Sequence, residues 1–245
     1  MPVSMSRRAL VLTPMRRELR PVVVYAGARR TRTAGLTTYA ARVGEVEVLI
    51  ARLGVGKDSS RSVIDRLLAT FEVDHVLISG IAGGILPELS VGTLVVPETV
   101  MDLDTGRRYE SAQIAGVERR GIAATTDRLI TNKEQIERLS ALGVVAVDME
   151  SSSVAAACEV AGLPWTAFRA ISDRPERQLA DRALISLLRD DGSTDVVSAA
   201  KFMVLHPHRV PGTVRLARDS SMAASEAARR TIEAIGRIGE IGEVA

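Results

Sequence analysis

Several short apolar segments of this sequence are followed by carboxylates, which can donate or accept a proton in catalysis. The pairs of segment and carboxylate are Ala9–Thr13 with Glu18, Val144–Val147 with Asp148 and Glu150, and Trp165–Ile171 with Asp173. Open α/β sheets bind ligands outside the carboxyl ends of their strands. If these segments are strands of one sheet, their carboxylates lie at the edge where a ligand binds.

The segment from Val144 to Asp173 reads as a strand, a helix and a second strand. A β-branched run ends at Asp148, a Ser- and Ala-rich run follows, and Gly162 suits the left-handed position that ends a helix. We expect Asp148 to be the N-cap and Glu150 to lie in the first turn, where the helix dipole favours an anion. If the two strands are adjacent and parallel, Glu150 and Asp173 face one cleft.

Arg169 lies within the second of these strands, in a run that is otherwise apolar. An unpaired buried charge is very costly, so Arg169 needs a partner. Glu150 or another carboxylate would serve. Part of the carboxylate pattern is therefore open to a structural explanation.

Glycines cluster around the end of the predicted strand His75–Ile81, at Gly80, Gly83 and Gly84. They either let the backbone approach a ligand closely or form a tight turn. The segment Gly54–Lys57 lacks the third glycine of the dinucleotide fingerprint, and no phosphate-binding P-loop spacing is present. The sequence therefore gives no sign of a nucleotide cofactor.

The histidines, His75, His206 and His208, do not converge with Cys158 or the carboxylates at a recognisable metal spacing. The Gly-x-Ser-x-Gly turn of a serine hydrolase is absent as well. We therefore expect neither a metal site nor a serine triad. Cys158 lies on the small-residue face of a predicted helix, which indicates a packing role.

Composition places the chain among α/β proteins of a reducing compartment. The 245 residues are 46% hydrophobic and 3% aromatic, with 32 basic and 30 acidic residues and one cysteine. A net charge of +2 is too balanced to indicate nucleic-acid binding, and a lone cysteine forms no internal disulfide. The apolar run Ala9–Leu12 is too short for a signal peptide. A cytoplasmic location is the expectation.

Strands alternate with helices along the chain, which predicts one α/β domain over residues 1–245. The other predicted strands are Val22–Tyr25, Leu36–Val43, Val46–Leu53, Thr93–Pro97 and Gly121–Thr125. The other predicted helices are Asp58–Phe71, Thr131–Leu142, Leu179–Arg189, Val196–Leu205 and Val214–Ile238. The segment between Tyr25 and Leu36 is predicted to be a polar, glycine-containing loop, and a helical extension is expected from about residue 179.

Three motifs resemble those of the nucleoside phosphorylase and nucleosidase superfamily. They are the glycine motif at residues 79–84 with Val91-Gly92 and Val95–Pro97, the Met-Glu motif at residues 147–150, and the Asp motif at residues 169–173. Their order and spacing cover most of residues 9–173. The resemblance implies a three-layer α/β/α domain with a central mixed, mostly parallel sheet, no cofactor, and a homodimer or larger assembly.

The resemblance also implies roles in cleaving an N-glycosidic bond. Asp173 matches the general acid that protonates the purine at N7. Glu150 matches the residue that binds ribose hydroxyls, with Met149 packing against the sugar. Purine binding is expected from Ser172, Leu129, Ile130, Ala82 and Gly83.

Glu18 matches the nucleosidase residue that positions and deprotonates the attacking water. Water needs a base, whereas phosphate is already an anion and a carboxylate would repel it. The early Gly-Asp-Pro segment with an Arg that the phosphorylases carry is not found here. Hydrolysis is therefore favoured, although Arg16 and Arg17 leave phosphate open.

Within the superfamily the chain looks closest to hopanoid-associated phosphorylase-like proteins, nucleosidases that remove adenine from adenosylhopane. The residues that carry this likeness are 146–151 and 214–219. Leu129 and Ile81 stand where related nucleosidases often have an aromatic ring and a serine, which makes the site more aliphatic. Residues 201–218 interleave apolar and basic side chains, which fits either contact with the inner membrane face or packing on the sheet or on a second copy. Alternatives are a phosphorylase, a 5'-methylthioadenosine/S-adenosylhomocysteine-type nucleosidase and a non-catalytic nucleoside-binding module.

Overall fold

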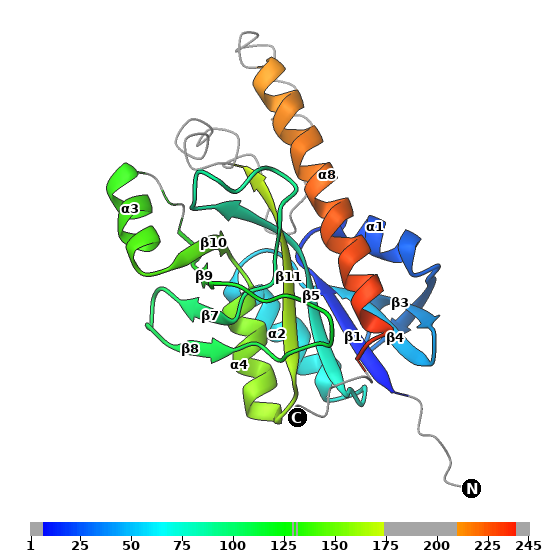
Figure 1. Ribbon diagram of the computed structural model, residues 1–245. Helices are drawn as coiled ribbons and strands as arrows, with labels where there is room; N and C mark the ends of the chain where they lie inside the picture. The colour runs from blue at the N-terminus through cyan, green and yellow to red at the C-terminus, as the bar shows by residue number, and fades with distance from the viewer. Residues whose placement is uncertain (1–6, 129, 131, 174–209, 239–245) are drawn as a thin grey trace, which may run out of the picture.

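A computed structural model describes residues 7–128, 130, 132–173 and 210–238 (Figure 1). The strands in this part of the chain are β1 (Arg8–Thr13), β2 (Arg29–Thr33), β3 (Leu36–Val43), β4 (Val46–Arg52), β5 (His75–Gly84), β6 (Leu94–Val95), β7 (Thr99–Asp102), β8 (Arg108–Glu110), β9 (Ile122–Thr125), β10 (Val144–Asp148) and β11 (Trp165–Asp173). The helices are α1 (Arg16–Tyr25), α2 (Lys57–Leu68), α3 (Lys133–Ala141), α4 (Ser151–Ala161) and α8 (Val210–Ile235).

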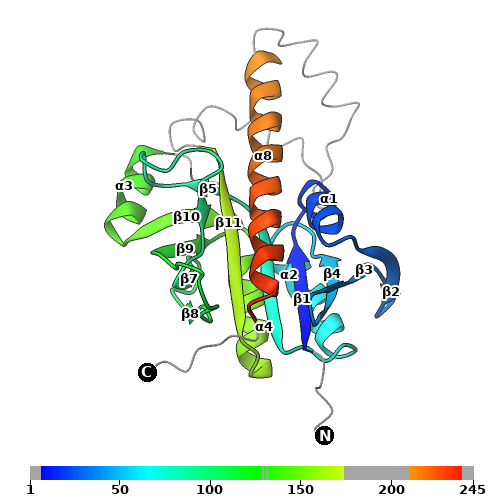
Figure 2. The same cartoon turned by 45° about the vertical axis from the view of Figure 1, so that its right-hand side comes forward.

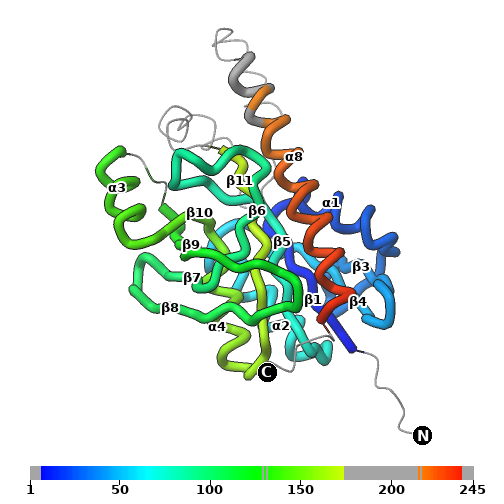
Figure 3. Tube along the Cα trace, viewed as in Figure 1, coloured from blue at the N-terminus to red at the C-terminus, as the bar shows by residue number. Residues whose placement is uncertain are grey.

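All the described strands join one sheet, in the order β2-β3-β4-β1-β5-β10-β9-β7-β8, with β11 paired to β5 and β6 paired to β11. Strands β4, β1, β5 and β11 are mutually parallel, and the β2–β3–β4 and β7–β8 hairpins add antiparallel strands toward the edges. The tube in Figure 3 shows β6 lying beside β11. The predicted α/β domain around a central mixed sheet is confirmed.

Helices cover both faces of the sheet, which gives the predicted three layers. Alternate residues of a strand point to opposite faces. In β1, Leu10 and Leu12 pack with residues of α2 and α4, whereas Ala9 and Val11 pack with residues of α1 and α8. Cys158 of α4 is fully buried in the first of these layers, which confirms its predicted packing role.

Two local expectations were wrong. Val22–Tyr25 forms the end of α1 rather than a strand. Its three β-branched valines favour a strand, but burial of one helix face at Leu19 and Val22 outweighs this preference. The segment expected to be a polar loop contains β2, which pairs along its whole length with β3. The helices expected at residues 179–189 and 196–205 lie outside the described residues.

Helix α8 packs along α1, β5 and β11 through its C-terminal half, while its N-terminal turns extend beyond the sheet (Figures 1 and 2). Most of its buried side chains are small, among them Ala223, Ala224, Ala227 and Ala228, so the helix lies close to the strands. In the part of the chain that the structure describes, none of the helices has the length and apolarity needed to cross a bilayer.

His75, at the start of β5, gives a prediction for stability. Its side chain is buried, Nε2 lies 2.9 Å from Thr166 Oγ1, and burial lowers the pKa of the imidazole to about 4. The unfolded chain takes up a proton near pH 6.5, whereas the folded chain does not until about pH 4. The free energy of unfolding should therefore fall by about 3 kcal/mol as the pH drops across that window.

The measurement is urea denaturation of the wild type and of His75→Gln at several pH values. Other titrating groups contribute equally to both proteins, so the difference between the two curves isolates His75. A difference that stays constant between pH 6.5 and pH 4 would show that the imidazole is not held neutral.

Candidate active site

Arg169 of β11 stands at the centre of the carboxylates that the sequence singled out. Its side chain is fully buried, and its Nε lies 2.9 Å from Asp148 Oδ2. Its Nη2 lies 3.7 Å from Glu150 Oε2, and both nitrogens donate to Ser151 Oγ, at 3.2 and 2.9 Å. The expectation that Arg169 needs a carboxylate partner is confirmed, and it has two.

Asp148 caps helix α4 from two positions before the N-cap, which it was expected to occupy itself. The N-cap residue is Glu150, and the helix begins at Ser151. Asp148 Oδ1 nevertheless accepts the N–H groups of Glu150 and Ser151, at 3.2 and 3.1 Å, and the Thr125 hydroxyl at 2.8 Å. The expected positions of Asp148 at the N-cap and Glu150 in the first turn were wrong because two more residues, Met149 and Glu150, precede the helix, while the capping function of Asp148 is retained.

Glu150 is held between Arg169 and the N-terminus of α2. Its side chain is 5% exposed, and its Oε1 accepts the Gly56 N–H at 3.1 Å. Burial raises the pKa of Glu150, Arg169 opposes that shift, and the nearby Asp148 and Glu18 carboxylates add to it. Glu150 thus sits where its position is fixed from two sides and where a negative charge is costly.

A second set of contacts closes a ring around Glu150. Ser152 Oγ donates to Asp102 Oδ2 at 2.9 Å, and Lys57 Nζ lies 3.3 Å from the same oxygen and also pairs with Asp104. Lys57 directly follows Gly56, which binds Glu150, and Ser152 lies two residues after Glu150. The ring therefore ties the start of α2 to the start of α4, on either side of Glu150.

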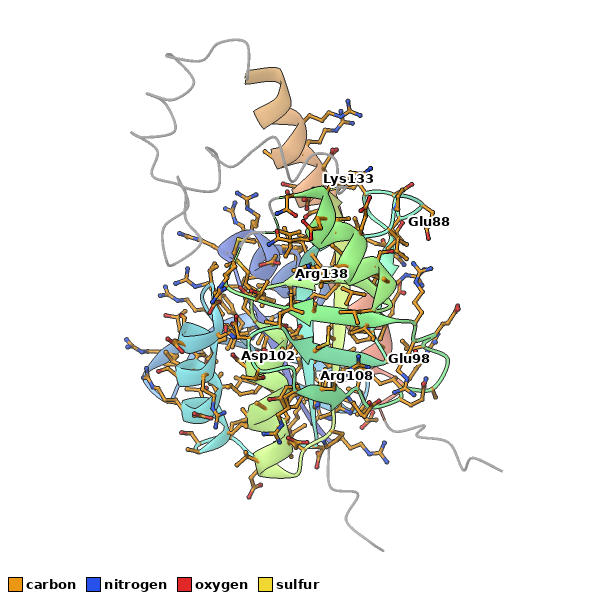
Figure 4. The ribbon with its side chains drawn as sticks, turned by 90° about the vertical axis from the view of Figure 1, so that its left-hand side faces the viewer. Glu88, Glu98, Asp102, Arg108, Lys133 and Arg138 are labelled. Atoms are coloured by element: carbon orange, nitrogen blue, oxygen red, sulfur yellow. The ribbon has the colours of Figure 1, made fainter. Side chains whose placement is uncertain are left out.

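Sequence reasoning missed Lys57 and Asp102. A sequence signal for Lys57 was present, because Gly54–Lys57 is a glycine turn that opens a helix. We interpreted this turn only as an incomplete dinucleotide fingerprint. Gly56 has φ of +91°, a conformation that suits glycine, and its N–H points to Glu150. Asp102 ends β7, on the face of the molecule shown in Figure 4.

Glu18 meets the same cluster from α1, on the other side of β5. It is 1% exposed, and its two oxygens accept the N–H groups of Ile81 and Met15 at 2.8 and 2.7 Å. A Cβ on residue 80 would lie 2.6 Å from Glu18 Oε1 and 2.5 Å from Arg169 Nη1. Glycine at position 80 is therefore what allows Glu18 and Arg169 to approach each other over the strand.

Electrostatics set Glu18 apart from an ordinary carboxylate. Burial raises its pKa to about 6, against the opposing effects of Arg169 and the two backbone N–H groups. Among the described residues, Arg169 Nη1 is buried without a hydrogen-bond partner. The site thus presents a proton acceptor with a pKa near neutrality next to an unused guanidinium N–H.

Asp173 ends β11 beside the glycine motif. It pairs in register with Gly83 of β5, and Ser172 Oγ lies 2.6 Å from Asp173 Oδ1 and 3.3 Å from the Ala82 carbonyl. Ser172 and Ala82 are buried, while Asp173 is partly exposed. The structure therefore brings together Ser172, Asp173, Ala82 and Gly83.

The strand arrangement that was expected to bring Glu150 and Asp173 together was wrong. Strands β10 and β11 are not adjacent and parallel. Each pairs with β5, β11 in parallel and β10 antiparallel through Gly83 and Gly84. The glycine-rich end of β5 is what lets strands of both directions meet there.

The remaining predicted ligand residues are less well placed by the structure. Met149 is partly exposed next to Glu150. Ile130 packs against a core cluster that includes Ile85, Met101 and Leu139. Leu129 lies outside the described residues.

Comparisons with known proteins identify the family of the chain. The family model described as Phosphorylase superfamily matches residues 8–119 and 110–205. The chain belongs to the phosphorylase superfamily, which confirms the resemblance read from its three motifs. The narrower likeness to hopanoid-associated proteins stays a prediction.

The similar proteins are nucleosidases. The chain is 30% identical to the 5'-methylthioadenosine/S-adenosylhomocysteine nucleosidase of Geobacillus kaustophilus over 177 residues, covering 60% of this chain and 75% of that protein. It is 25% identical to the aminodeoxyfutalosine nucleosidase of Helicobacter pylori over 223 residues, covering 79% and 94%. The S-adenosylhomocysteine nucleosidase structure from Streptococcus pyogenes superposes with a TM-score of 0.71 at 19% identity, covering 95% of this chain and 98% of that one.

Proposed function

We propose that this protein is a purine nucleosidase that hydrolyses the N-glycosidic bond of an adenosyl compound. The observation that carries the proposal is the buried Glu18 carboxylate, which approaches Arg169 Nη1 over Gly80. A carboxylate acceptor and an unpaired guanidinium donor this close together can both contact one water molecule. A pKa of about 6 makes Glu18 an effective base near neutral pH. The nucleosidase relatives support the same reaction class.

In the reaction, Asp173 donates a proton to N7 of the purine. The bond between the sugar carbon C1' and the base nitrogen breaks, and its electron pair leaves with the base. The water oxygen bonds to C1' and passes a proton to Glu18. Glu150 accepts hydrogen bonds from the ribose hydroxyls. Positive charge develops on the sugar in the transition state, and the fixed Glu150 carboxylate stabilises this charge.

Phosphate is the less suitable nucleophile for this site. Glu18 and Glu150 are both buried carboxylates, and the cation between them, Arg169, is already paired with Asp148. Arg16 is exposed and Arg17 is partly exposed, on the helix that carries Glu18. An anion entering next to Glu18 would meet repulsion from both carboxylates, and Arg169, whose charge is already shared with Asp148 and Glu150, would offset only part of it.

The proposed substrate is an adenosyl compound with a bulky apolar 5' substituent, adenosylhopane in the first place. The likeness of residues 146–151 and 214–219 to hopanoid-associated proteins supports this choice. The N–H of Ile81 donates to Glu18, and the Ile81 side chain packs against Ala170 and against Ala223 and Ala227 of α8. The surroundings of the general base Glu18 are therefore aliphatic on this side. Contact of residues 201–218 with the inner membrane face stays a prediction, because most of their side chains lie outside the described part.

One assay distinguishes the reaction types. The protein is incubated with adenosine and with 5'-substituted adenosines, with and without phosphate, and adenine and the sugar product are identified. Adenine release at the same rate without phosphate, with a free sugar, supports the proposal. Formation of ribose 1-phosphate would identify a phosphorylase, and no adenine from any of these substrates would favour a binding module. Faster turnover of apolar 5'-alkyl adenosines than of adenosine supports the substrate class.

The ring around Glu150 gives a second prediction. Lys57→Met removes the cation that joins Asp102 and Asp104, so the N-terminus of α2 loses its tether and the Gly56 N–H no longer holds Glu150 in place. We expect KM for the nucleoside to rise about tenfold while kcat changes less, because ribose positioning is weakened but the acid and base remain.

The matched control is Lys133→Met, which removes an exposed lysine from a helical ion pair with Glu137. It should leave KM and kcat unchanged. If Lys57→Met lowered only the melting temperature and left KM at the wild-type value, the ring would have a structural role alone.

A further inference from the structure

The nearly balanced net charge of the chain conceals a strong asymmetry. Residues 1–44 contain nine arginines, no lysine and one acidic residue, Glu18, which is buried. The other 201 residues contain 23 basic and 29 acidic residues. The first segment therefore carries a net charge of +8 and the rest a net charge of −6. An asymmetry of this size indicates an interaction with an anionic partner.

The arginines gather on α1 and on the edge strand β2. Arg16 and Arg20 are exposed and four residues apart on one side of α1, and Val24 continues the same line. Arg29, Arg30 and Arg32 are exposed on β2, which follows α1 after a short turn. These six residues are called the arginine face below. Figure 2 shows α1 and the β2–β3 hairpin together on one side of the molecule.

The arginines of this face have no carboxylate partners within the described part of the chain. Of the nine arginines in the first 44 residues, Arg8 pairs with Glu72 and Glu47, and Arg42 pairs with Glu45 and Glu47. The five arginines of the arginine face form no such pairs there. Charged side chains on an edge strand also prevent edge-to-edge association of sheets, and this role would account for the arginines on β2. It does not account for Arg16 and Arg20 on a helix.

An apolar element accompanies these charges. Val24 is 75% exposed, and the neighbouring Tyr25 is 46% exposed with its hydroxyl 2.8 Å from Ser225 Oγ. Single exposed apolar residues need no explanation, but here the two lie together among arginines. Arginine recognises phosphate through a planar fork of donors, and apolar or aromatic side chains enter the boundary between headgroups and acyl chains.

We propose that the arginine face docks the protein on an anionic phospholipid bilayer. Several unpaired arginines meet the headgroup phosphates, and Val24 enters the boundary layer between them. A nucleic acid would use the arginines but would gain little from Val24. The opposite face carries both signs, with Glu88 and Glu98 among Arg108, Lys133 and Arg138 (Figure 4). The proposal does not depend on the reaction that the site catalyses.

Co-sedimentation with sucrose-loaded vesicles tests the proposal with the full chain. We expect the protein to sediment with phosphatidylcholine vesicles that contain phosphatidylglycerol, and not with phosphatidylcholine alone. Binding should be lost between about 0.1 and 1 M salt, because the Debye length shortens. The triple variant Arg29→Gln, Arg30→Gln, Arg32→Gln should bind on the order of 100-fold more weakly. Val24→Gln should bind several-fold more weakly.

The control is a triple variant that removes the same number of charges from the opposite face, at Arg108, Lys133 and Arg138. It should sediment like the wild type, and both triple variants should cleave a soluble nucleoside at the wild-type rate. Equal losses in the two triple variants would overturn the proposal, as would wild-type binding that does not depend on the anionic lipid. Binding to an oligonucleotide that Val24→Gln leaves unchanged, with no vesicle binding, would assign the face to nucleic acid instead.

Discussion

Replacing Asp173 by Asn should lower kcat for adenine release by about a thousandfold, while nucleoside binding and the fold persist. Asn keeps the shape of the side chain, and its carbonyl oxygen can accept the hydrogen bond that Ser172 Oγ makes at 2.6 Å. It has no acidic proton to donate to the leaving base. The loss should therefore fall on kcat rather than on KM.

A substrate whose leaving group needs no proton separates this role from a structural one. Nitrophenyl riboside is such a substrate: its leaving group departs as the stable nitrophenolate anion, so Asp173→Asn should cleave it at close to the wild-type rate. Asp65→Asn, at an exposed aspartate paired with Arg61, is the matched control for the chemical change. If Asp173→Asn lost activity equally on the adenosine compound and on nitrophenyl riboside, the acid role would be wrong. Full activity on adenosine compounds would contradict it as well.

The sequence predicted the site best where a local pattern had a local cause. The predicted strands before Asp148 and Asp173 are present as β10 and β11, although their arrangement was not predicted, and a charged residue in an apolar run led to the partners of Arg169. The glycine motif was left open between a tight turn and a close approach. Gly80 lies inside β5, so it makes no tight turn, and it leaves room for two side chains of the protein itself, because a Cβ there would collide with both Glu18 and Arg169.

What the sequence did not reveal depends on contacts between distant segments. Lys57 reaches Asp102 across 45 residues, and Gly56 reaches Glu150 across 94. No spacing in the chain records such pairs. The antiparallel pairing of β10 was missed for the same reason, since strand direction in a mixed sheet is decided by the connections and not by composition. Strand β2 was missed because arginine-rich segments resemble loops.

The cluster around Arg169 shows how the site costs stability. Asp148, Glu150 and Glu18 surround one guanidinium, so the buried cluster is anionic when all three carboxylates are ionised. Burial raises the pKa of both glutamates, and the nearby Asp148 and Glu18 carboxylates raise that of Glu150 further. An apolar replacement of a buried ion pair is often neutral or stabilising, so the presence of this cluster is weak evidence for a role in folding.

Glu18→Gln should lower kcat for hydrolysis by about a thousandfold, because the amide cannot accept the proton of the attacking water. The fold should persist, since two effects on stability oppose each other. Removing a buried charge whose pKa is raised to about 6 stabilises the folded state by about 2 kcal/mol at neutral pH. The amide, however, can accept only one of the two N–H groups that Glu18 binds, which costs about 1–3 kcal/mol.

The pH dependence of stability separates these two effects and tests the state of Glu18 directly. The unfolded carboxyl releases its proton near pH 4.5 and the folded one near pH 6, so the folded wild type loses stability as the pH rises through this window. The unpaired N–H in the variant costs the same at every pH. The stability of Glu18→Gln relative to the wild type should therefore increase by about 2 kcal/mol between pH 4.5 and pH 7.

In the wild type, kcat/KM should fall below about pH 6 as Glu18 becomes protonated. A stability difference independent of pH, with kcat/KM unchanged down to pH 5, would show that Glu18 is an ordinary carboxylate and not the base.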